Sequence, residues 1–408
     1  MLVASEVRLA PTGPCERSRG RPSTRVLRSR IAGRAHVPPV RPYPHAAPGR
    51  ARLQARARAA RQPLKSASAM SRSAGTLPDA GLFGTHPRRV IDLILERASS
   101  AAGPQPDRSR KLALIIEGGG MRGVVSAGSL LALDLLGFRE VFDEIYATSA
   151  GAVNAAYFLS GQGKLGMTIY FDDIANRRFI NPWRLLKIVD VDYAYDRVIS
   201  LHKPLDDVAI RASRVRFLLS VTDARSGLNE LLDVRARPEP VPLLLKASSA
   251  LPVLYNRRIT LDGREYVDGG VSDSLPIARA IENGCTHILV LASSRCDSPM
   301  ARPALWERSL FYIRMGRRYP ALMRAFASMH EAVNRSRRLA TGDEAVDGVN
   351  VALIAPCDGD SPVGSTAIER ARLVRGAHQM ATRTFEIFAR ERTILDALFE
   401  TYRARSSG

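Results

Sequence analysis

Apolar residues in this chain gather into short runs, and the segments between these runs show apolar residues at helical spacing. The runs that predict buried strands lie at residues 112–116, 144–148, 216–222, 287–291 and 349–355. Helical patterns lie between and after them, at residues 124–136, 150–159, 242–250, 276–283, 306–339 and 366–399. Residues 259–266 predict a hairpin around Asp262-Gly263. Strands that alternate with helices indicate an α/β fold with a mainly parallel sheet covered by helices on both faces.

The same pattern divides the chain. Residues 1–106 show little apolar periodicity and are rich in Arg, Pro, Ala, Ser and Gly, which predicts a disordered segment. Within this segment, residues 86–101 have helical spacing and predict a short docking helix. We expect the ordered core of one domain at residues 110–300. Residues 301–400 should form a helical C-terminal part of the same domain with one closing strand.

The positive charge is concentrated at the start of the chain. The 408 residues carry a net charge of +20, and residues 1–70 hold fourteen Arg and one Lys against Glu6 and Glu16, or +13. The remaining +7 is ordinary for a soluble enzyme, so the strong basicity is a property of the tail. Three interpretations of the tail remain open: a nucleic-acid-binding arm, an organelle transit peptide, or an over-long gene start.

Cysteine spacing and hydropathy give expectations for the cellular location of the protein. Cys15, Cys285, Cys296 and Cys357 show neither paired nor metal-type spacing, so we expect reduced thiols in a cytoplasmic protein. No apolar run reaches the roughly 20 residues that a membrane-spanning helix needs. A signal-peptide core is not recognisable either.

Three consecutive glycines follow the first predicted strand. Gly118, Gly119 and Gly120 leave the backbone N–H groups accessible just before a helix, which is typical of an anion site. With Gly123 they also fit the dinucleotide-binding fingerprint. That fingerprint requires an acidic residue at the end of the second strand. Because this strand ends in Thr148 and Ser149, nucleotide binding is disfavoured.

The end of the second predicted strand suggests a nucleophile. Ser149 lies between a strand and a helix with Ala147 before it and Gly151 after it, which is similar to the Gly-x-Ser-x-Gly nucleophile elbow. Ala147 replaces the first glycine of that motif. The alternative is a serine that caps the following helix.

An elbow serine needs an oxyanion site and a base. The glycine turn offers the first, and Arg122 within it could equally fix the loop by a salt bridge. Asp268 is a candidate base because it follows a strand and precedes Gly269 and Gly270, although a plain Asp-Gly turn is the alternative. The histidines that a conventional triad would use lie outside glycine-framed turns, at His202, His287, His330 and His378.

Three motifs in this order resemble the patatin-like phospholipase family: Glu117 to Gly123, Thr148 to Ala152, and Asp268 to Gly270. The resemblance covers residues 111–292, including residues 247–255, and Ala147 is the one departure within a motif. It implies a three-layer patatin-like fold and a Ser149–Asp268 dyad. The implied oxyanion loop comprises Gly118, Gly119, Gly120, Met121, Arg122 and Gly123, and the implied elbow and turn glycines are Gly151, Gly269 and Gly270. Residues 177–183 and the long C-terminal part resemble a bacterial branch of that family.

The resemblance implies a lipid acyl hydrolase of the phospholipase A type that uses neither a cofactor nor a metal ion. Its substrate would be a lipid or phospholipid ester, with peripheral contact to an anionic membrane surface. Residues 306–339 combine aromatic residues with many Arg, so they could cover the site, touch such a surface, or form a packed helix with a solvated basic face. A dinucleotide-binding, nucleic-acid-binding or non-catalytic protein is the alternative, and nucleic acid is disfavoured as a partner.

Overall fold

The computed structural model describes residues 82–100, 108–184, 187–255, 257–295, 299–388, 399 and 402. The basic tail with its three interpretations lies outside the described residues. So do Cys15 and Cys296, and most of the last ten residues of the helix predicted at 366–399.

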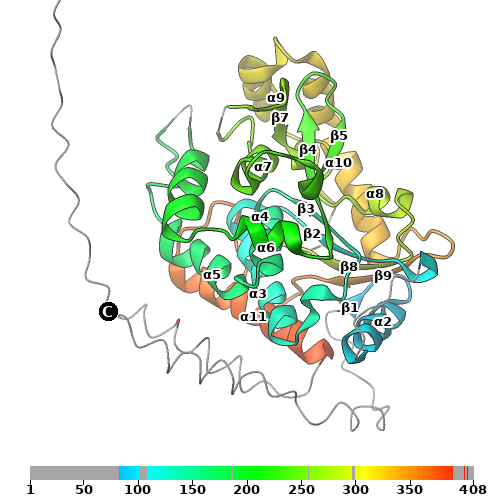
Figure 1. Cartoon of the computed structure of the whole chain (residues 1–408). Coiled ribbons are helices and arrows are strands. Elements are labelled where there is room, and N and C mark those ends of the chain that lie inside the picture. Colours follow the sequence, from blue (N-terminus) through cyan, green and yellow to red (C-terminus); the bar gives the residue numbers. More distant parts are fainter. Residues whose placement is uncertain are drawn as a thin grey trace, which may run out of the picture. The chain divides into compact units, whose positions relative to one another are not determined.

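A single sheet of nine strands organises the described part of the chain (Figure 1). Its order is β1 (Leu82–Phe83), β9 (Asn350–Ile354), β8 (His287–Leu291), β2 (Leu112–Ile116), β3 (Glu144–Thr148), β4 (Arg216–Asp223), β7 (Arg264–Asp268) and β6 (Ile259–Leu261), with β5 (Asn229–Asp233) also paired to β4. The five strands from β9 to β4 are parallel. The pairings of β1, β5, β6 and β7 are antiparallel.

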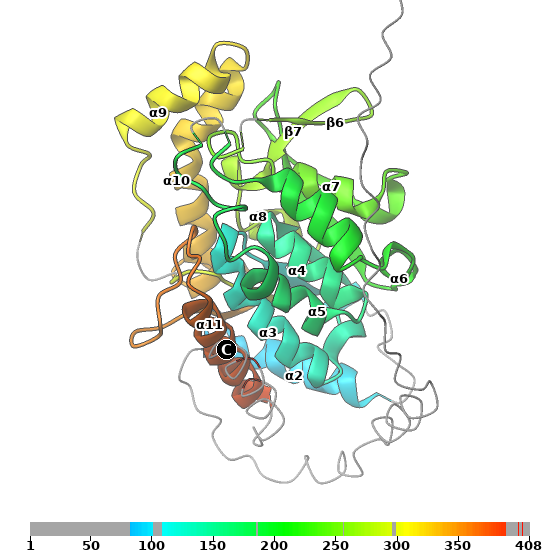
Figure 2. The same cartoon turned by 90° about the vertical axis from the view of Figure 1, so that its left-hand side faces the viewer.

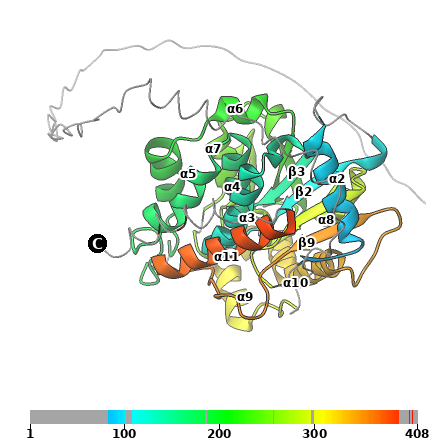
Figure 3. The same cartoon turned by 90° about the horizontal axis from the view of Figure 1, so that it is seen from below.

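Helices cover both faces of the sheet because its parallel strands are apolar on both sides. In β2, Leu112, Leu114 and Ile116 face one layer, whereas Ala113 and Ile115 face the other. The first layer contains α2 (Pro87–Ser99), α3 (Gly123–Leu135), α4 (Ala150–Leu159) and α11 (Arg370–Phe388), and the second contains α8 (Ile277–Glu282) and part of α10 (Pro320–Thr341). Figure 3 shows α11 packed along α3. The predicted three-layer α/β architecture with a mainly parallel sheet is therefore confirmed.

The remaining elements are short. They comprise α5 (Gly163–Thr168), η4 (Ile169–Asp173), η5 (Tyr193–His202), α6 (Asp207–Ala212), α7 (Val241–Ser248), α9 (Leu305–Phe311), η8 (Tyr312–Gly316), and the single turns η1 (Arg108–Arg110), η2 (Gly120–Arg122), η3 (Phe138–Glu140), η6 (Val234–Ala236) and η7 (Gly269–Val271). Helix α9 lies at one end of the described structure, and α2 lies toward the other (Figure 2).

The ordered fold begins earlier than the sequence pattern predicts. Strand β1 pairs with β9, and α2 buries Val90, Ile91 and Ile94 against the sheet. Arg97 at the end of α2 is also buried, and it bonds to Asp143 at 2.8 Å. The expected disordered segment at residues 1–106 is therefore wrong for residues 82–100. The short helix predicted at residues 86–101 is confirmed as α2, whereas β1 was not predicted.

One other prediction needs correction, and one further strand was not predicted. The helix predicted at residues 306–339 is interrupted, because Pro320 restricts Tyr319 to a non-helical conformation with φ −131° and ψ 73°. Strand β5 was not predicted, because most of its side chains are only half-buried and it lacks a strongly apolar run. The described part of the last predicted helix forms α11 at Arg370–Phe388.

Among the described helices, none combines the length and apolar character that crossing a membrane requires.

Candidate active site

The glycine turn and Ser149 meet at the carboxyl ends of two adjacent parallel strands. Ile116 at the end of β2 pairs with Ala147 of β3, so the residues that follow each strand become neighbours. A Cβ placed on Gly118 would lie 3.0 Å from Cβ of Ser149. The carboxyl ends of parallel strands are where ligands bind in open α/β sheets.

Ser149 occupies the sharp turn between β3 and α4. Its φ of 55° and ψ of −125° are unusual for a residue with a side chain. Its N–H donates to Oγ of Ser248 at 2.9 Å, and that hydroxyl donates to the carbonyl of Ser220 at 2.7 Å. The Ser149 side chain makes no capping bond to α4. The hydroxyl is therefore directed elsewhere, as an elbow nucleophile requires.

Gly151 allows α4 to begin so close to β2. A Cβ at this position would lie 2.6 Å from the carbonyl oxygen of Ile116 and 2.7 Å from that of Glu117. Ala147, the departure from the motif, is fully buried within β3 between Ile116 and Leu219. The strand accommodates its methyl group, so the alanine does not prevent the turn.

Asp268 reaches Ser149 from the antiparallel half of the sheet. It ends β7 and pairs with Val221 of β4. The Ser149 hydroxyl donates to Oδ2 of Asp268 at 2.7 Å, and the N–H of Gly270 donates to Oδ1 at 2.7 Å. Gly269 is required between them because a Cβ there would clash with the backbone of Ser220. Both carboxylate oxygens are thus held in place.

Burial makes Asp268 a stronger base than an exposed aspartate. Its side chain is 1% exposed, and this desolvation raises the pKa to about 6, although the hydrogen bonds from Ser149 and Gly270 act to lower it. The carboxylate remains ionised at neutral pH. Its pKa lies close enough to neutrality for general-base catalysis.

The N–H groups of the glycine loop fall into two sets, those with an acceptor and those without one among the described residues. Met121 N–H donates to the Ser365 carbonyl at 3.0 Å, Arg122 N–H donates to the Gly119 carbonyl at 3.2 Å, and Gly123 N–H is also bonded. In contrast, the N–H groups of Gly118, Gly119 and Gly120 have no acceptor among the described residues.

The same is true of the N–H of Ala150, at the start of α4. Four backbone donors near the ends of β2 and β3 therefore have no acceptor within the described part of the chain.

A buried carboxylate holds the glycine loop in position. Oε2 of Glu117 accepts hydrogen bonds from the N–H groups of Ser293 at 2.7 Å and Ser294 at 3.2 Å, which follow β8. The Ser293 hydroxyl lies 2.6 Å from the Gly118 carbonyl, to which it can donate. The sequence analysis missed Ser293, Ser248 and Ser220, because serines that position backbone groups carry no motif of their own.

Among the described residues, Arg122 has no ion-pair partner, so the salt bridge that was the alternative explanation for it is not found there. Its Nε is buried and has no hydrogen-bond partner in the described structure. A Cβ placed on Gly119 would lie 3.2 Å from this atom. The guanidinium group therefore lies against the glycine loop.

None of the four candidate histidines is bonded to Ser149 or Asp268 within the described structure. His287 contacts Thr286 and Asn350 at the amino end of the sheet, and His378 packs on Phe399. His202 is exposed at the end of η5, and His330 lies on α10 beside Glu331. The geometry thus brings Ser149 to a carboxylate without an intervening imidazole.

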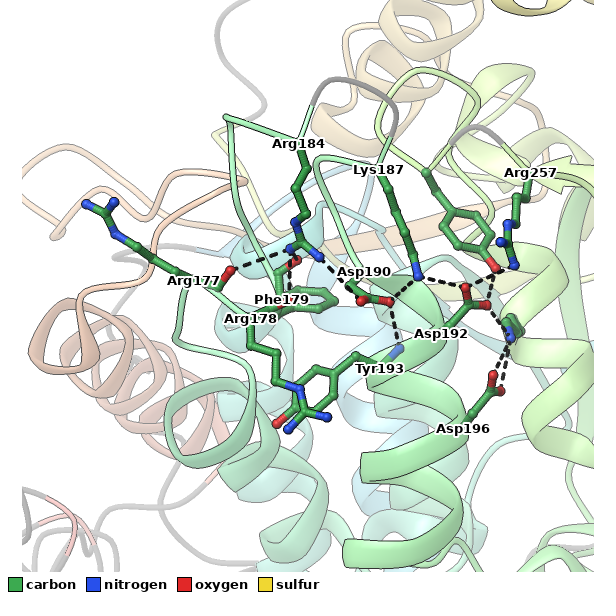
Figure 4. A network of polar contacts seen from close by, with 12 residues as sticks. Arg177, Arg178, Phe179, Arg184, Lys187, Asp190, Asp192, Tyr193, Asp196 and Arg257 are labelled. Atoms are coloured by element: carbon green, nitrogen blue, oxygen red, sulfur yellow. Dashed lines mark hydrogen bonds and ion pairs between the residues drawn. The ribbon is translucent and has the colours of Figure 1, made fainter. Parts of the chain in front are cut away.

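The arginine-rich stretch at residues 177–184 joins a network of polar contacts around Asp190 and Asp192 (Figure 4). Asp192 accepts hydrogen bonds or ion pairs from Lys187 at 2.9 Å, Lys246 at 2.7 Å, Arg257 at 3.3 Å and the Tyr255 hydroxyl. These cations hold the pKa of Asp192 well below its ordinary value despite desolvation.

Lys246 links this network to the nucleophile. It lies on α7, which ends at Ser248, the partner of the Ser149 backbone. From η5, the Tyr195 hydroxyl lies 2.5 Å from Oγ of Ser249. Burial raises the pKa of Tyr195, and the charge of Asp268 adds to this shift. Asp192 and Tyr195 are therefore linked to α7 and to Ser249, which directly follows it.

The paired side chains are almost closed off from solvent. Ser149 is 7% exposed and Asp268 is 1% exposed. A cavity of about 580 Å³ lies elsewhere, and its lining of Gly161, Gln162, Lys164, Leu165, Thr168, Asp172, Lys203 and Tyr402 includes neither residue.

Comparison with known families matches the part of the chain that carries this arrangement. Residues 114–281 match the model of the family described as patatin-like phospholipase, and this range contains the glycine loop, Ser149 and Asp268. This region is a patatin-like phospholipase domain. The match supports lipid hydrolysis at the level of the family.

Individual relatives of the patatin-like domain are distant. The uncharacterized protein YjjU of Escherichia coli (strain K12) is 28% identical over 193 residues, which cover 46% of this chain and 53% of YjjU. The chain therefore spans about half the length of this curated relative.

Solved structures are more distant still. VipD from Legionella pneumophila shows 13% identity and a TM-score of 0.39, over 80% of this chain and 73% of VipD. The type III effector protein ExoU shows 13% identity and a TM-score of 0.26, over 70% of this chain and 62% of ExoU. Both scores are too low to support an argument about function.

Proposed function

We propose that the chain is a lipid acyl hydrolase that cleaves carboxylic esters with a Ser149–Asp268 dyad. The observation that carries the proposal is the 2.7 Å hydrogen bond from Ser149 Oγ to Oδ2 of a buried aspartate, next to a glycine loop whose first three N–H groups have no acceptor among the described residues. We also propose that the catalytic domain includes β1 and α2, because both are packed into the same sheet and core.

Acylation would begin when Oδ2 of Asp268 takes the proton from Ser149 Oγ. The Oγ atom then bonds to the carbonyl carbon of the ester, and the carbonyl oxygen becomes an oxyanion. We propose that the N–H groups of Gly118, Gly119, Gly120 and Ala150, which have no acceptor among the described residues, supply the donors for this oxyanion. When the tetrahedral intermediate collapses, the leaving alcohol takes the proton from Asp268 and the acyl group remains on Ser149.

Deacylation would repeat the same steps with water. Asp268 takes a proton from a water molecule, and the hydroxide attacks the acyl carbon. Collapse of the second intermediate breaks the bond to Ser149 Oγ, which recovers its proton from Asp268, and the fatty acid leaves. This route uses only the groups of the chain and one water molecule.

The elevated pKa of Asp268 resolves a difficulty of a carboxylate base. An aspartate near its ordinary pKa of about 4 is a weak base at neutral pH. At a pKa of about 6, the ionised form still dominates at pH 7 and accepts a proton more readily. The pre-formed hydrogen bond to Ser149 adds the benefit of proximity.

The almost closed site favours a substrate presented by an aggregated lipid phase rather than a freely diffusing polar molecule. We therefore propose a phospholipid or related lipid ester as substrate and peripheral contact with a membrane as the working state.

Labelling with a fluorophosphonate ester, followed by mass mapping of the modified peptide, tests the proposal. The label should map to Ser149, and Ser149→Ala should abolish labelling and ester turnover while the thermal unfolding profile stays unchanged. Ser328→Ala is a matched control, because Ser328 bonds only to carbonyls of its own helix and is exposed. A label on another residue, or wild-type turnover in Ser149→Ala, contradicts the proposal.

A further inference from the structure

A helical segment near the site exposes an unusual number of large apolar side chains. Helix α9 continues into η8 from Leu305 to Gly316. Leu305, Trp306, Tyr312 and Ile313 are 78%, 67%, 50% and 72% exposed. The spacing i, i+1, i+7 and i+8 places them on one side of the helix. We call these four residues the apolar stripe.

The apolar stripe is not the packing face of this helix. The other side carries Phe311 and Met315, which are buried. Phe311 stacks on Phe326 of α10 at a centroid distance of 4.1 Å. The Arg314 guanidinium also donates to the Val253 carbonyl. The segment is therefore docked on the domain by one apolar face, and a second apolar face remains directed to solvent.

The surroundings of the apolar stripe are strongly basic. Residues 301–324 contain six arginines and a single acid, Glu307. The Glu307 carboxylate accepts from the N–H of Ala304 at 2.7 Å and so belongs to the start of α9. The exposed arginines of this segment are Arg302, Arg317, Arg318 and Arg324. Large apolar side chains framed by arginines are typical of helices that lie in a membrane interface.

The apolar stripe lies at the catalytic end of the sheet. The buried side of the same helix, with Phe311 and Met315, packs against Val267 and Val271, which lie on either side of the Asp268 turn. It also packs against Ala224, which follows β4. In Figures 1 and 2, α9 correspondingly lies at the end of the described structure near β7. The stripe therefore belongs to the part of the domain that packs around the Asp268 turn.

We propose that the apolar stripe inserts into the interface of a bilayer that contains anionic phospholipid, while the neighbouring arginines bind its headgroups. Tryptophan and tyrosine favour the boundary between hydrocarbon and water, and arginine can extend its charged end toward the headgroups. The choice of a lipid surface rests on the proposed function, because the ester must be delivered to Ser149 from a membrane. The net positive charge selects anionic over zwitterionic lipid.

The two tryptophans of the chain allow a direct test. Trp183→Phe leaves Trp306 as the sole tryptophan, so its emission reports the stripe. On addition of phosphatidylglycerol/phosphatidylcholine vesicles, this emission should shift to the blue and be quenched by brominated acyl chains. Vesicles of phosphatidylcholine alone, or high salt, should weaken the response. An unchanged Trp306 spectrum at saturating anionic lipid overturns the inference.

Sedimentation with the same vesicles measures the contribution of the stripe. The triple variant Leu305→Ser, Trp306→Ser, Ile313→Ser should bind about tenfold or more weakly, because it removes most of the apolar area available for insertion. Leu135→Ser with Val208→Ser is the matched control. Both residues are exposed, and they lie at the end of α3 and in α6, toward the amino end of the sheet. The control should bind like the wild type.

Turnover of a soluble short-chain ester separates this inference from the proposed function. The triple variant should retain wild-type turnover of that ester. If the wild type lacks ester turnover but vesicle binding still depends on the stripe, the proposed function fails and the inference stands. If the triple variant binds vesicles as tightly as the wild type, the inference fails. Conversion of a wild-type dimer into a monomer by the triple variant, with unchanged vesicle binding, would instead assign the stripe to contact between copies.

Discussion

Asp268→Asn should make the protein inactive and, at alkaline pH, more stable. The substitution keeps an oxygen that accepts from the Gly270 N–H, but it removes the basic oxygen that faces Ser149. Turnover should fall nearly as far as in Ser149→Ala, and the double variant should be little worse than either single variant, because members of one catalytic unit are not additive.

The stability change follows from the pKa of Asp268. Folding raises it from 3.8 to about 6, so ionising the buried carboxylate at high pH lowers the free energy of unfolding by about 3 kcal/mol. In the wild type, this contribution to the free energy of unfolding is fully present below pH ~4, where Asp268 is protonated. It is lost as the pH rises to about 6 and the buried carboxyl group ionises. Relative to the wild type, Asp268→Asn should therefore gain about 3 kcal/mol at pH 8 and almost nothing at pH 4.

Urea unfolding at pH 4 and pH 8 measures this difference. Asp262→Asn is the matched control, because Asp262 lies exposed in the turn between β6 and β7, where Asn-Gly is as suitable as Asp-Gly. Its effect on stability should be small at both pH values. If Asp268→Asn gains no more stability at pH 8 than at pH 4, burial does not destabilise the ionised carboxylate of Asp268. The raised pKa that we use to explain its basicity would then be wrong.

Three further predictions concern the surroundings of Ser149. Gly120→Ala should lower turnover about 100-fold, the scale of a lost oxyanion donor, because φ is +59° and the new Cβ would lie 2.7 Å from the Ser365 carbonyl; unchanged turnover would place the oxyanion site elsewhere. Ser248→Ala removes the acceptor for the Ser149 N–H and should lower kcat more than it raises KM for a soluble ester, whereas equal effects on a folded variant would contradict this. The acid limb of kcat/KM should lie near pH 6, and His202→Gln and His330→Gln should leave turnover within about tenfold of wild type; a folded histidine variant as inactive as Ser149→Ala would restore a triad.

The pH profile alone cannot separate the dyad from a histidine-dependent triad. A histidine base has an ordinary pKa of about 6.5, and an exposed aspartate would keep activity to much lower pH. Burial of Asp268 raises its pKa close to the histidine value, so both mechanisms give similar acid limbs. The histidine variants therefore carry the distinction.

The central sheet could be predicted from the sequence because its parallel strands are buried on both faces. Such strands appear as continuous apolar runs, and the structure gives Leu112–Ile116, Glu144–Thr148 and His287–Leu291 at the predicted positions. The edge elements β1 and β5 were missed, because half-buried strands carry a weaker pattern.

The residues of the candidate site could be predicted from the sequence only where the backbone of the site requires glycine. Glycines near Ser149 and Asp268 are required by close approaches and turns, so they leave a signal in the sequence. Which of the loop N–H groups are already bonded depends on Ser365, far along the chain, and the pKa of Asp268 depends on its burial. Neither property has a local pattern.

The strand order has a consequence for synthesis of the chain. Strand β2 is made early, yet its neighbour β8 comes late, and Glu117 holds the glycine loop through Ser293, 176 residues further on. Asp268 is likewise 119 residues beyond Ser149. A nascent chain that has emerged only through β4 thus has the nucleophile but lacks both the base and the support for the loop. If the proposed dyad is correct, ester hydrolysis can begin only when most of the domain has left the ribosome.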